Sequence, residues 1–245
     1  WVPEPAAEDR PEGRHAGVSS LASSYSFYFS HHITTMEGGG IATDDDELAD
    51  DLRSMRSHGW SRDRSDAEEW ESSSSSNDSK FLFVSTGYNV RPMEIQAAVG
   101  SSQLADLDKF VRRRREIARK VHESLRGTDM TVIGSERLES KDLEQGHSWM
   151  LVPIRISAPN FRERRNEVLD YLNSSGVETR PVLTGNFLAQ PAVQRIFRQS
   201  VNPDSYTQAS LTAQSSFLVG AHHELSDEQV DHLCRSLKEV GSRSA

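Results

Sequence analysis

The segment that most constrains the fold is residues 21–43, in which an aromatic-rich run precedes two histidines and three consecutive glycines. The run LASSYSFYF at 21–29 predicts a buried strand bounded by polar residues. The glycines predict a tight turn, and residues 41–43 predict a short returning strand. The paired histidines His31 and His32 therefore follow the end of the first strand.

The next part of the chain predicts one helix and a long loop. Thr43 is predicted to cap a helix whose acidic first turn suits the positive end of the helix dipole. This helix ends near Gly59. Residues 60–80 are expected to form a loop, because they end in a serine-rich tract that cannot build a core. Residues 81–84 predict a short apolar strand.

A long helix is predicted from Pro92 to about Arg126, with a bend at Gly100. Its apolar residues recur at helical spacing: Ile95, Val99, Leu104, Leu107, Val111, Ile117, Val121 and Leu125. The basic run Arg112–Arg115 within it is interpreted as a solvated charged face and not as a nucleic-acid site.

The remaining sequence alternates strand and helix. Strands are predicted at 130–133, 149–156 and 177–183. Two capping pairs are predicted to begin helices, Asn160 with Glu163 and Ser226 with Gln229. His222 and His223 precede the second pair and are interpreted as a turn pair.

This alternation indicates an α/β fold, with an α/β layer followed by a smaller α+β domain. We expect residues 1–19 to be a divergent N-terminal remnant. Residues 20–126 would form the remainder of a large domain that includes the long helix, and residues 127–245 the small α+β domain.

Composition excludes several classes of function. The formal net charge of −9 argues against nucleic-acid binding. No apolar run approaches the length of a membrane-spanning helix, and the N-terminus lacks a secretory signal pattern. The single cysteine, Cys234, excludes a disulfide framework and any metal site built from several thiolates. A cytoplasmic protein that binds neither membrane nor nucleic acid is expected.

Taken alone, the histidine pair is most simply a strand end with two incidental side chains. A zinc site is a second interpretation, but adjacent side chains on an extended strand point to opposite faces. An acidic third ligand at suitable spacing is also missing. We therefore expect no metal site.

The full string SFYFSHHITTMEGG, residues 26–39, closely resembles the active-site segment of the DegT/DnrJ/EryC1/StrS sugar aminotransferases. Ser26, Phe27 and the Glu-Gly-Gly at 37–39 match that pattern, and His31 stands where the family has a lysine. The resemblance resumes in the same order in three further blocks, GYNVRPMEIQAAVGSSQL (87–104), VETRPVLTGNFLAQP (177–191) and FLVGAHHELSDEQVD (217–231).

The resemblance implies the aspartate-aminotransferase fold (fold type I), with a three-layer αβα domain that binds pyridoxal 5′-phosphate (PLP) or its amine form, pyridoxamine 5′-phosphate (PMP). The histidine and the Thr-Arg-Pro…Gly-Asn string at 179–186 resemble the sugar 3-dehydratase branch. One type of 3-dehydratase holds an iron–sulfur cluster through cysteines in the loop that corresponds to 60–80. This loop has no cysteine, so the cluster-free GDP-sugar type is implied.

The resemblance also implies roles for individual residues. His31 would be the acid–base residue for loss of the C3 hydroxyl from a nucleotide-linked 4-keto-6-deoxysugar, since imidazole moves protons near neutral pH. Ser26 would contact the cofactor phosphate. Asn89 would reach the same phosphate from a partner subunit, which implies a homodimer. Arg180 would face the substrate, and L-glutamate would restore the amine form of the cofactor.

Two alternatives stay open: a sugar aminotransferase with an unusual base, and a non-catalytic remnant or dimerisation module. The resemblance covers only the later part of a typical member, so the chain is interpreted as an N-terminally truncated form. The acid that pairs with the pyridine nitrogen is not assigned, although Asp9 is a candidate. An incomplete sheet exposes apolar surface. We therefore expect the isolated chain to fold poorly or associate, and to bind PLP weakly.

Overall fold

The computed structural model describes residues 20–75, 79–139, 147–197 and 202–244. The predicted remnant at 1–19, with Asp9, lies outside the described residues. The chain divides into two compact units, with the division after Leu107.

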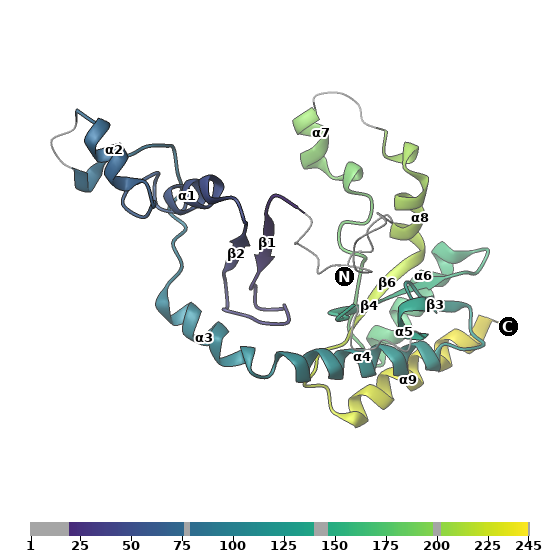
Figure 1. The fold of residues 1–245 in the computed structure, drawn as a ribbon. Helices are drawn as coiled ribbons and strands as arrows, with labels where there is room; N and C mark the ends of the chain where they lie inside the picture. Colours follow the sequence, from purple (N-terminus) through teal and green to yellow (C-terminus); the bar gives the residue numbers. More distant parts are fainter. Residues whose placement is uncertain (1–19, 76–78, 140–146, 198–201, 245) are drawn as a thin grey trace, which may run out of the picture. The chain divides into compact units, whose positions relative to one another are not determined.

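The first unit is built on a two-stranded antiparallel ribbon, seen as β1 and β2 in Figure 1. Its elements are β1 (Ser23–Ser26), β2 (Gly39–Ala42), α1 (Asp46–Met55), α2 (Ala67–Ser73), the 3-10 helix Ser79–Phe81 and α3 (Glu94–Leu104). In the ribbon Ser23 lies opposite Ala42 and Ser26 lies opposite Gly39. The predicted strand 21–29 is therefore too long, because the chain leaves the ribbon after Ser26 and folds into the loop that carries His31.

The cap of α1 differs from the prediction. Asp45 is the capping residue, and its Oδ1 accepts a hydrogen bond from the backbone N–H of Leu48 at 2.9 Å. Thr43 instead donates from its hydroxyl to the carbonyl of Leu21 at 2.7 Å. Thr43 therefore fixes the segment that joins β2 to α1. Asp45, which lies closer to the helix, satisfies a backbone N–H of its first turn.

The segment 60–84 also differs from the prediction. Helix α2 lies inside the segment that was predicted to be a loop. None of its residues is buried, so its sequence has no apolar stripe that would predict a helix. Residues 81–84 form a single bridge, between Trp60 and Phe83, and not a strand. At this crossing a Cβ atom on Gly87 would lie 2.3 Å from the backbone nitrogen of Gly59. Only glycine allows the two backbones to pass so closely.

The predicted long helix is two helices, α3 and α4 (Leu107–Ser124). They are separated at Ala105 and Asp106, where the N–H of Asp106 donates to the carbonyl of Gln103 at 3.1 Å. The predicted bend at Gly100 is wrong, because Gly100 lies inside α3 and is buried. The buried part of the predicted stripe belongs to α4, where Ile117 and Val121 are fully enclosed.

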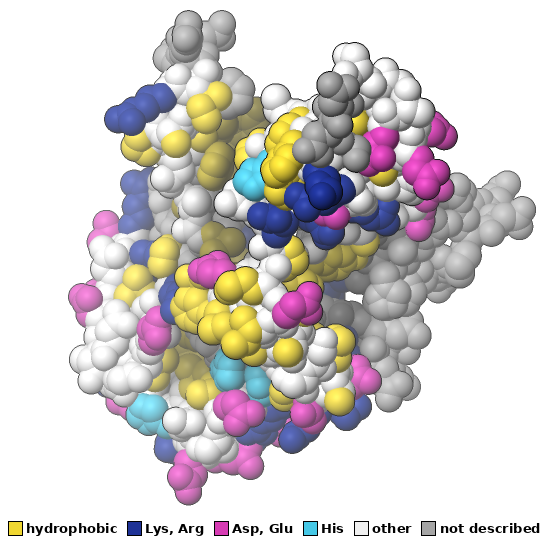
Figure 2. All heavy atoms as spheres, turned by 90° about the vertical axis from the view of Figure 1, so that its left-hand side faces the viewer, with side chains coloured by type: hydrophobic (Ala, Val, Ile, Leu, Met, Phe, Trp, Pro, Cys, Tyr) yellow, Lys and Arg dark blue, Asp and Glu magenta, His cyan; other side chains and the backbone are white. Residues whose placement is uncertain are grey.

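The first unit has no apolar core among its described residues. Its buried residues other than glycine are all polar: Thr35, Asp50, Ser54, Ser57 and Ser61. Large apolar side chains are instead exposed, among them Leu21, Phe29, Phe81, Tyr88, Ile95 and Leu104. Figure 2 shows hydrophobic side chains gathered at the surface of one face. Surface of this kind is normally covered by further protein.

The second unit is an α+β arrangement around an antiparallel sheet with the strand order β3–β4–β6–β5. Its strands are β3 (Met130–Val132), β4 (Leu151–Ile156), β5 (Thr179–Arg180) and β6 (Ser216–Gly220). Its helices after α4 are α5 (Glu136–Glu139), α6 (Phe161–Ser174), α7 (Pro191–Phe197), α8 (Thr207–Ser215) and α9 (Asp227–Gly241). Short 3-10 helices lie at Phe187–Ala189, Pro203–Ser205 and Ser242–Ser244.

Alternation along β4 explains how this sheet builds the core. Val152, Ile154 and Ile156 are buried, whereas the residues between them are half-buried. Phe217 of β6 lies opposite Ile154 and is fully enclosed. Apolar residues of α4, α6 and α9 complete one hydrophobic cluster. The second unit therefore has the core that the first unit lacks.

The two predicted capping pairs had different outcomes. Ser226 and Gln229 form a capping box at α9: the N–H of Gln229 donates to the Ser226 hydroxyl at 3.2 Å, and the N–H of Ser226 donates to Oε1 of Gln229 at 2.9 Å. Asn160 precedes α6 but its side chain makes no capping hydrogen bond. The predicted strand 177–183 is reduced to Thr179–Arg180.

Candidate active site

His31 lies in the loop that joins β1 to β2 in the first unit. The loop is closed by backbone hydrogen bonds from Phe27 N–H to the Gly38 carbonyl at 2.9 Å and from Thr35 N–H to the Phe27 carbonyl at 2.8 Å. Within it, His31 N–H donates to the Tyr28 carbonyl at 3.0 Å, which forms a tight turn. The sequence therefore places the imidazole just past the end of β1, as predicted.

Helix α3 holds this loop through two glutamines on one face. The Gln103 side chain accepts from the N–H of Thr34 at 3.1 Å and donates to the Thr34 carbonyl at 2.7 Å. In the first turn of the same helix, the side chain of Gln96 donates a hydrogen bond to the carbonyl of Glu37 at 2.6 Å. Together they fix the backbone that follows His31.

Gly100 lies between the two glutamines on the same helical face. A Cβ atom there would lie 2.9 Å from the Cγ2 atom of Thr35, so the glycine lets the helix approach the loop closely. A cavity of about 280 Å³ lies beside this contact and is lined by Phe27, Thr35 and Leu104 among others. Sequence reasoning missed this clamp: the spacing i, i+4 and i+7 of Gln96, Gly100 and Gln103 places them on one helical face, but it does not reveal what that face contacts.

The imidazole of His31 has an unsatisfied atom. Its Nδ1 is buried and has no hydrogen-bond partner in the described part of the chain. The ring lies edge-on to Tyr28, with centroids 6.0 Å apart. An imidazole nitrogen without a protein partner can exchange a proton once a bound molecule reaches it.

Ser26 and Asn89 belong to the same unit as His31, and both are exposed. The Ser26 hydroxyl accepts a long hydrogen bond of 3.4 Å from the N–H of Tyr28, which leaves its proton available to an acceptor. Asn89 forms an isolated backbone bridge with Ser57 and follows the close crossing of the chain at Gly87. Their predicted contacts with a cofactor phosphate stay predictions.

Arg180 lies in the second unit, on β5. Its guanidinium pairs with Glu178, with Nη2–Oε1 at 2.9 Å, and the arginine side chain is 56% exposed. Asn186 of the same sequence block is buried, and it donates to the Pro203 carbonyl at 2.8 Å and to the Ser210 hydroxyl at 2.9 Å. Asn186 therefore holds the local backbone, and the role of Arg180 towards substrate stays a prediction.

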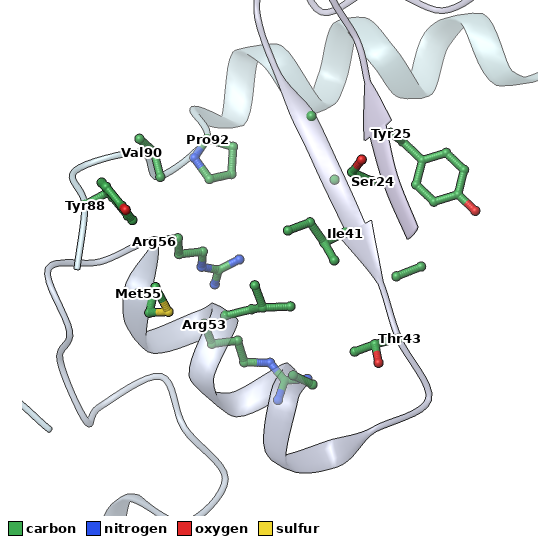
Figure 3. A pocket seen from close by; sticks show the side chains of 15 residues that line it. Ser24, Tyr25, Ile41, Thr43, Arg53, Met55, Arg56, Tyr88, Val90 and Pro92 are labelled. Atoms are coloured by element: carbon green, nitrogen blue, oxygen red, sulfur yellow. The ribbon is translucent and has the colours of Figure 1, made fainter. Parts of the chain in front are cut away.

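A second cavity in the first unit has a volume of about 700 Å³ and lies between the ribbon and α1. Figure 3 shows Arg53 and Arg56 on the α1 side and Ile41 on the ribbon side. Arg53 is paired with Asp50 at 2.8 Å. The hydroxyl and N–H of Ser65 and the charge of Arg53 lower the pKa of Asp50 to about 2. This network fixes the turn that follows α1.

The described ranges offer neither a metal-binding cluster nor a membrane-spanning helix. They contain no cluster of three or more histidine, cysteine, aspartate or glutamate side chains that could hold a metal ion. None of the helices in the described part of the chain has the length and apolar character needed to cross a membrane.

The sequence pattern of the DegT/DnrJ/EryC1/StrS aminotransferase family matches residues 6–238. The chain belongs to this family. The fold is consistent with it, since the solved structures that resemble the chain include a sugar 3-dehydratase and an aminotransferase.

Within the family, the chain is similar to a GDP-4-keto-6-deoxy-D-mannose 3-dehydratase of Yersinia pseudotuberculosis, with 34% identity over 233 residues. That match covers 94% of this chain and 56% of the relative. The structure of the Escherichia coli enzyme of the same name, with bound hydrated PLP, matches with a TM-score of 0.75 and 33% identity. It covers 91% of this chain and 56% of that one. The chain thus spans little more than half the length of these relatives.

A more distant solved structure shows the fold alone. The aminotransferase PseC of Helicobacter pylori matches with a TM-score of 0.76 and 23% identity, over 96% of this chain and 57% of that one.

Proposed function

We propose that this chain is part of a PLP- or PMP-dependent sugar 3-dehydratase, in which His31 is the acid–base residue. The observation that carries the proposal is the position of His31 after β1, on a loop clamped by α3, with Nδ1 buried and unpartnered. The similarity to 3-dehydratases over nearly the whole chain supports the same reaction class.

The residues present fit the cofactor. The Ser26 hydroxyl keeps a proton to donate to a phosphate oxygen, and the vacant Nδ1 of His31 provides a position for proton exchange. Asn89 would supply a further phosphate contact from a second copy of the chain, so the functional form is a homodimer. When bound, the cofactor supplies an electron sink for bond breaking at the sugar.

The chain's own contribution is the movement of one proton. The imidazole of His31 cannot form the lasting covalent link to an aldehyde that a lysine amine forms. It accepts a proton on its free nitrogen and returns it to the departing C3 hydroxyl of a nucleotide-linked 4-keto-6-deoxysugar, which leaves as water. Arg180 would contact the substrate, and L-glutamate would be the amine donor. We place the reaction in the cytoplasm.

The test is a mass measurement of the sugar product. The protein would be incubated with PLP, L-glutamate and a GDP-linked 4-keto-6-deoxyhexose. Loss of the C3 oxygen is the expected result, and His31→Asn should abolish it while PLP binding persists. Accumulation of an amino sugar would indicate the aminotransferase alternative, and absence of any product the non-catalytic one. Unchanged turnover in His31→Asn would remove the role assigned to His31.

A further inference from the structure

The cavity between the ribbon and α1 has no part in the reaction proposed above. Its volume of about 700 Å³ falls within the roughly 300–1,000 Å³ that small-molecule sites occupy in proteins. Residues 24–25 and 39–43, residues 49–56 and residues 88–92 supply its lining. All of these segments belong to the first unit. The cavity is therefore a candidate ligand site within a single unit.

The charged side chains that line this cavity are both arginines. Arg53 lies in the last turn of α1 and Arg56 directly follows the helix, so the two lie on the same side of it. Figure 3 shows both extending from α1 to the side on which Ile41 lies. None of the described lining residues is an aspartate or a glutamate. The cavity therefore favours an anion.

The two arginines differ in how they are held. Arg53 pairs with Asp50 at 2.8 Å, and the same carboxylate accepts the backbone N–H of Ser65 at 3.0 Å. Asp50 does not line the cavity, so it anchors Arg53 from outside. Arg56 has no ion pair among the described residues. One fixed and one uncompensated guanidinium group side by side match the several oxygens of a phosphate.

Much of the remaining lining is apolar. Ile41 of β2, Met55, Val90 and Pro92 contribute to it. Ile41 and Val90 are 54% and 64% exposed, although both are aliphatic. A ring placed against these two side chains would remove apolar surface from water. The occupant that fits both parts of the lining is thus an anion with a ring-containing body.

The cavity also adjoins the loop that carries His31. Gly39 and Pro92 line both this cavity and the one of about 280 Å³ beside Thr35. Gly39 lies opposite Ser26 in the ribbon. A molecule in the larger cavity would therefore lie next to the segment in which the cofactor phosphate is expected.

We propose that this cavity binds a ring-bearing organic phosphate, with the phosphate paired to Arg53 and Arg56 and the ring against Ile41 and Val90. Two compounds of this chemistry take part in the proposed reaction: the nucleotide of the sugar substrate and the vitamin-B6 phosphate. The choice of these probes rests on the proposed function, whereas the binding itself does not.

The experiment titrates the 245-residue chain by calorimetry with GDP and, separately, with pyridoxine 5′-phosphate. Each is compared with its ring alone and its phosphate alone: guanosine and pyrophosphate, or pyridoxine and inorganic phosphate. At least one whole compound should bind saturably, about tenfold or more tightly than either of its parts. The tighter of the two identifies the source of the ligand. Binding of neither, or equal binding of the phosphate part alone, would overturn the proposal, whatever the outcome of the product assay.

Variants locate the binding. Arg56→Met should weaken it about tenfold or more. Arg62→Met is the matched control, because Arg62 lies over the ring of Trp60, 3.4 Å from its centroid, and does not line the cavity. Loss of affinity in Arg62→Met equal to that in Arg56→Met would show a general effect of charge and overturn the proposed site.

A second pair of variants covers the case in which Arg56→Met does not fold. Ile41→Glu places a negative charge in the cavity wall and should weaken binding of the phosphate. Ile95→Glu adds the same charge at an exposed apolar position on α3 outside the cavity and should not. Circular dichroism confirms that each variant is folded. Unchanged affinity in Ile41→Glu would contradict the proposal.

Discussion

Two buried arginines of the second unit differ in how their charge is balanced. Arg164 donates from Nε to Asp129 at 2.9 Å, reaches Glu167 at 3.4 Å, and also donates to the carbonyl of Val240 near the end of α9. It therefore joins α6, the turn before β3 and the last turn of α9. Arg114 has backbone carbonyls but no carboxylate in the described ranges. At the residue scale, Arg164 is balanced by carboxylates, whereas Arg114 meets only backbone carbonyls among the described residues.

Arg164→Met should strongly destabilise the second unit. The substitution leaves Asp129 with a half-buried charge and the Val240 carbonyl without its donor. Removing one partner of a buried ion pair costs about 3 kcal/mol or more of unfolding free energy. Urea unfolding followed by circular dichroism would measure it. Arg243→Met, which breaks an exposed pair with Glu239, should cost less than about 1 kcal/mol. Equal costs would show that Arg164 is not a clamp.

Acidification should weaken the second unit through three histidines. Partial desolvation lowers the pKa of His147, His222 and His223 in the folded state, and positive neighbours lower it further. As the pH falls, these histidines therefore bind protons at a higher pH in the unfolded chain than in the folded chain. Stability should be unaffected well above about pH 6.5, fall as the pH drops through that value, and level off below the folded pKa values. Urea titrations at several pH values would show this slope. The double variant His222→Asn, His223→Asn should flatten it, and an unchanged slope would contradict the assignment.

At the element scale, the strands and helices predicted from the sequence agree better with the structure in the second unit than in the first. Strands β3 and β4 lie within the predicted ranges, because alternating burial in a sheet leaves a readable pattern. Helix α2 and the break at Ala105 were missed, because neither has an apolar stripe or a glycine or proline to mark it. Arg114 was misread as part of a charge run, although it lies three residues before Ile117 and seven before Val121, on the buried face of α4.

The candidate site was predictable only in part. The position of His31 after a strand followed from residues 21–43, but the family role came from resemblance. The clamp of Gln96 and Gln103 joins segments far apart in sequence, so no local pattern could reveal their contact.

The capping difference between α9 and α6 gives a matched pair of variants. Ser226→Ala removes an observed capping hydrogen bond and should cost about 1 kcal/mol of unfolding free energy. Asn160→Ala removes a side chain without a capping hydrogen bond and should cost clearly less. Denaturant midpoints of the two variants provide the comparison. The reverse order of costs would mean that the observed bonds do not account for capping.

Gln103→Ala should loosen the loop that carries His31. It removes two hydrogen bonds to the backbone of Thr34, each contributing about 1 kcal/mol. Hydrogen exchange at residues 31–37 should become faster. Ser102→Ala is the control, because the Ser102 hydroxyl bonds only within its own helix, to Val99. Equal exchange in both variants would exclude a role for the clamp.

For the whole molecule, the decisive fact is the unequal distribution of apolar burial. The hydrophobic cluster lies entirely in the second unit, whereas the buried residues of the first unit are polar or glycine. The first unit is consequently held by hydrogen bonds and exposes many large apolar side chains. This agrees with a chain that spans little more than half the length of its relatives.

The two units should therefore differ in resistance to proteolysis. Limited digestion of the 245-residue chain should cut the first unit rapidly and leave a fragment that begins near Asp108. Mass spectrometry would identify the cut sites. The unprotected apolar surface should also make the chain self-associate with rising concentration in light scattering. A monomer whose first unit resists digestion would contradict both expectations.

The clamp between α3 and the His31 loop also sets an order of events during synthesis. Thr34 and Gln103 are separated by 69 residues. At translation rates of about 5–20 residues per second, roughly 3 to 14 seconds pass between the appearance of the histidine and that of the glutamine that fixes its loop. During this interval the loop that carries His31 lacks the two hydrogen bonds from Gln103, so it emerges before the clamp can form.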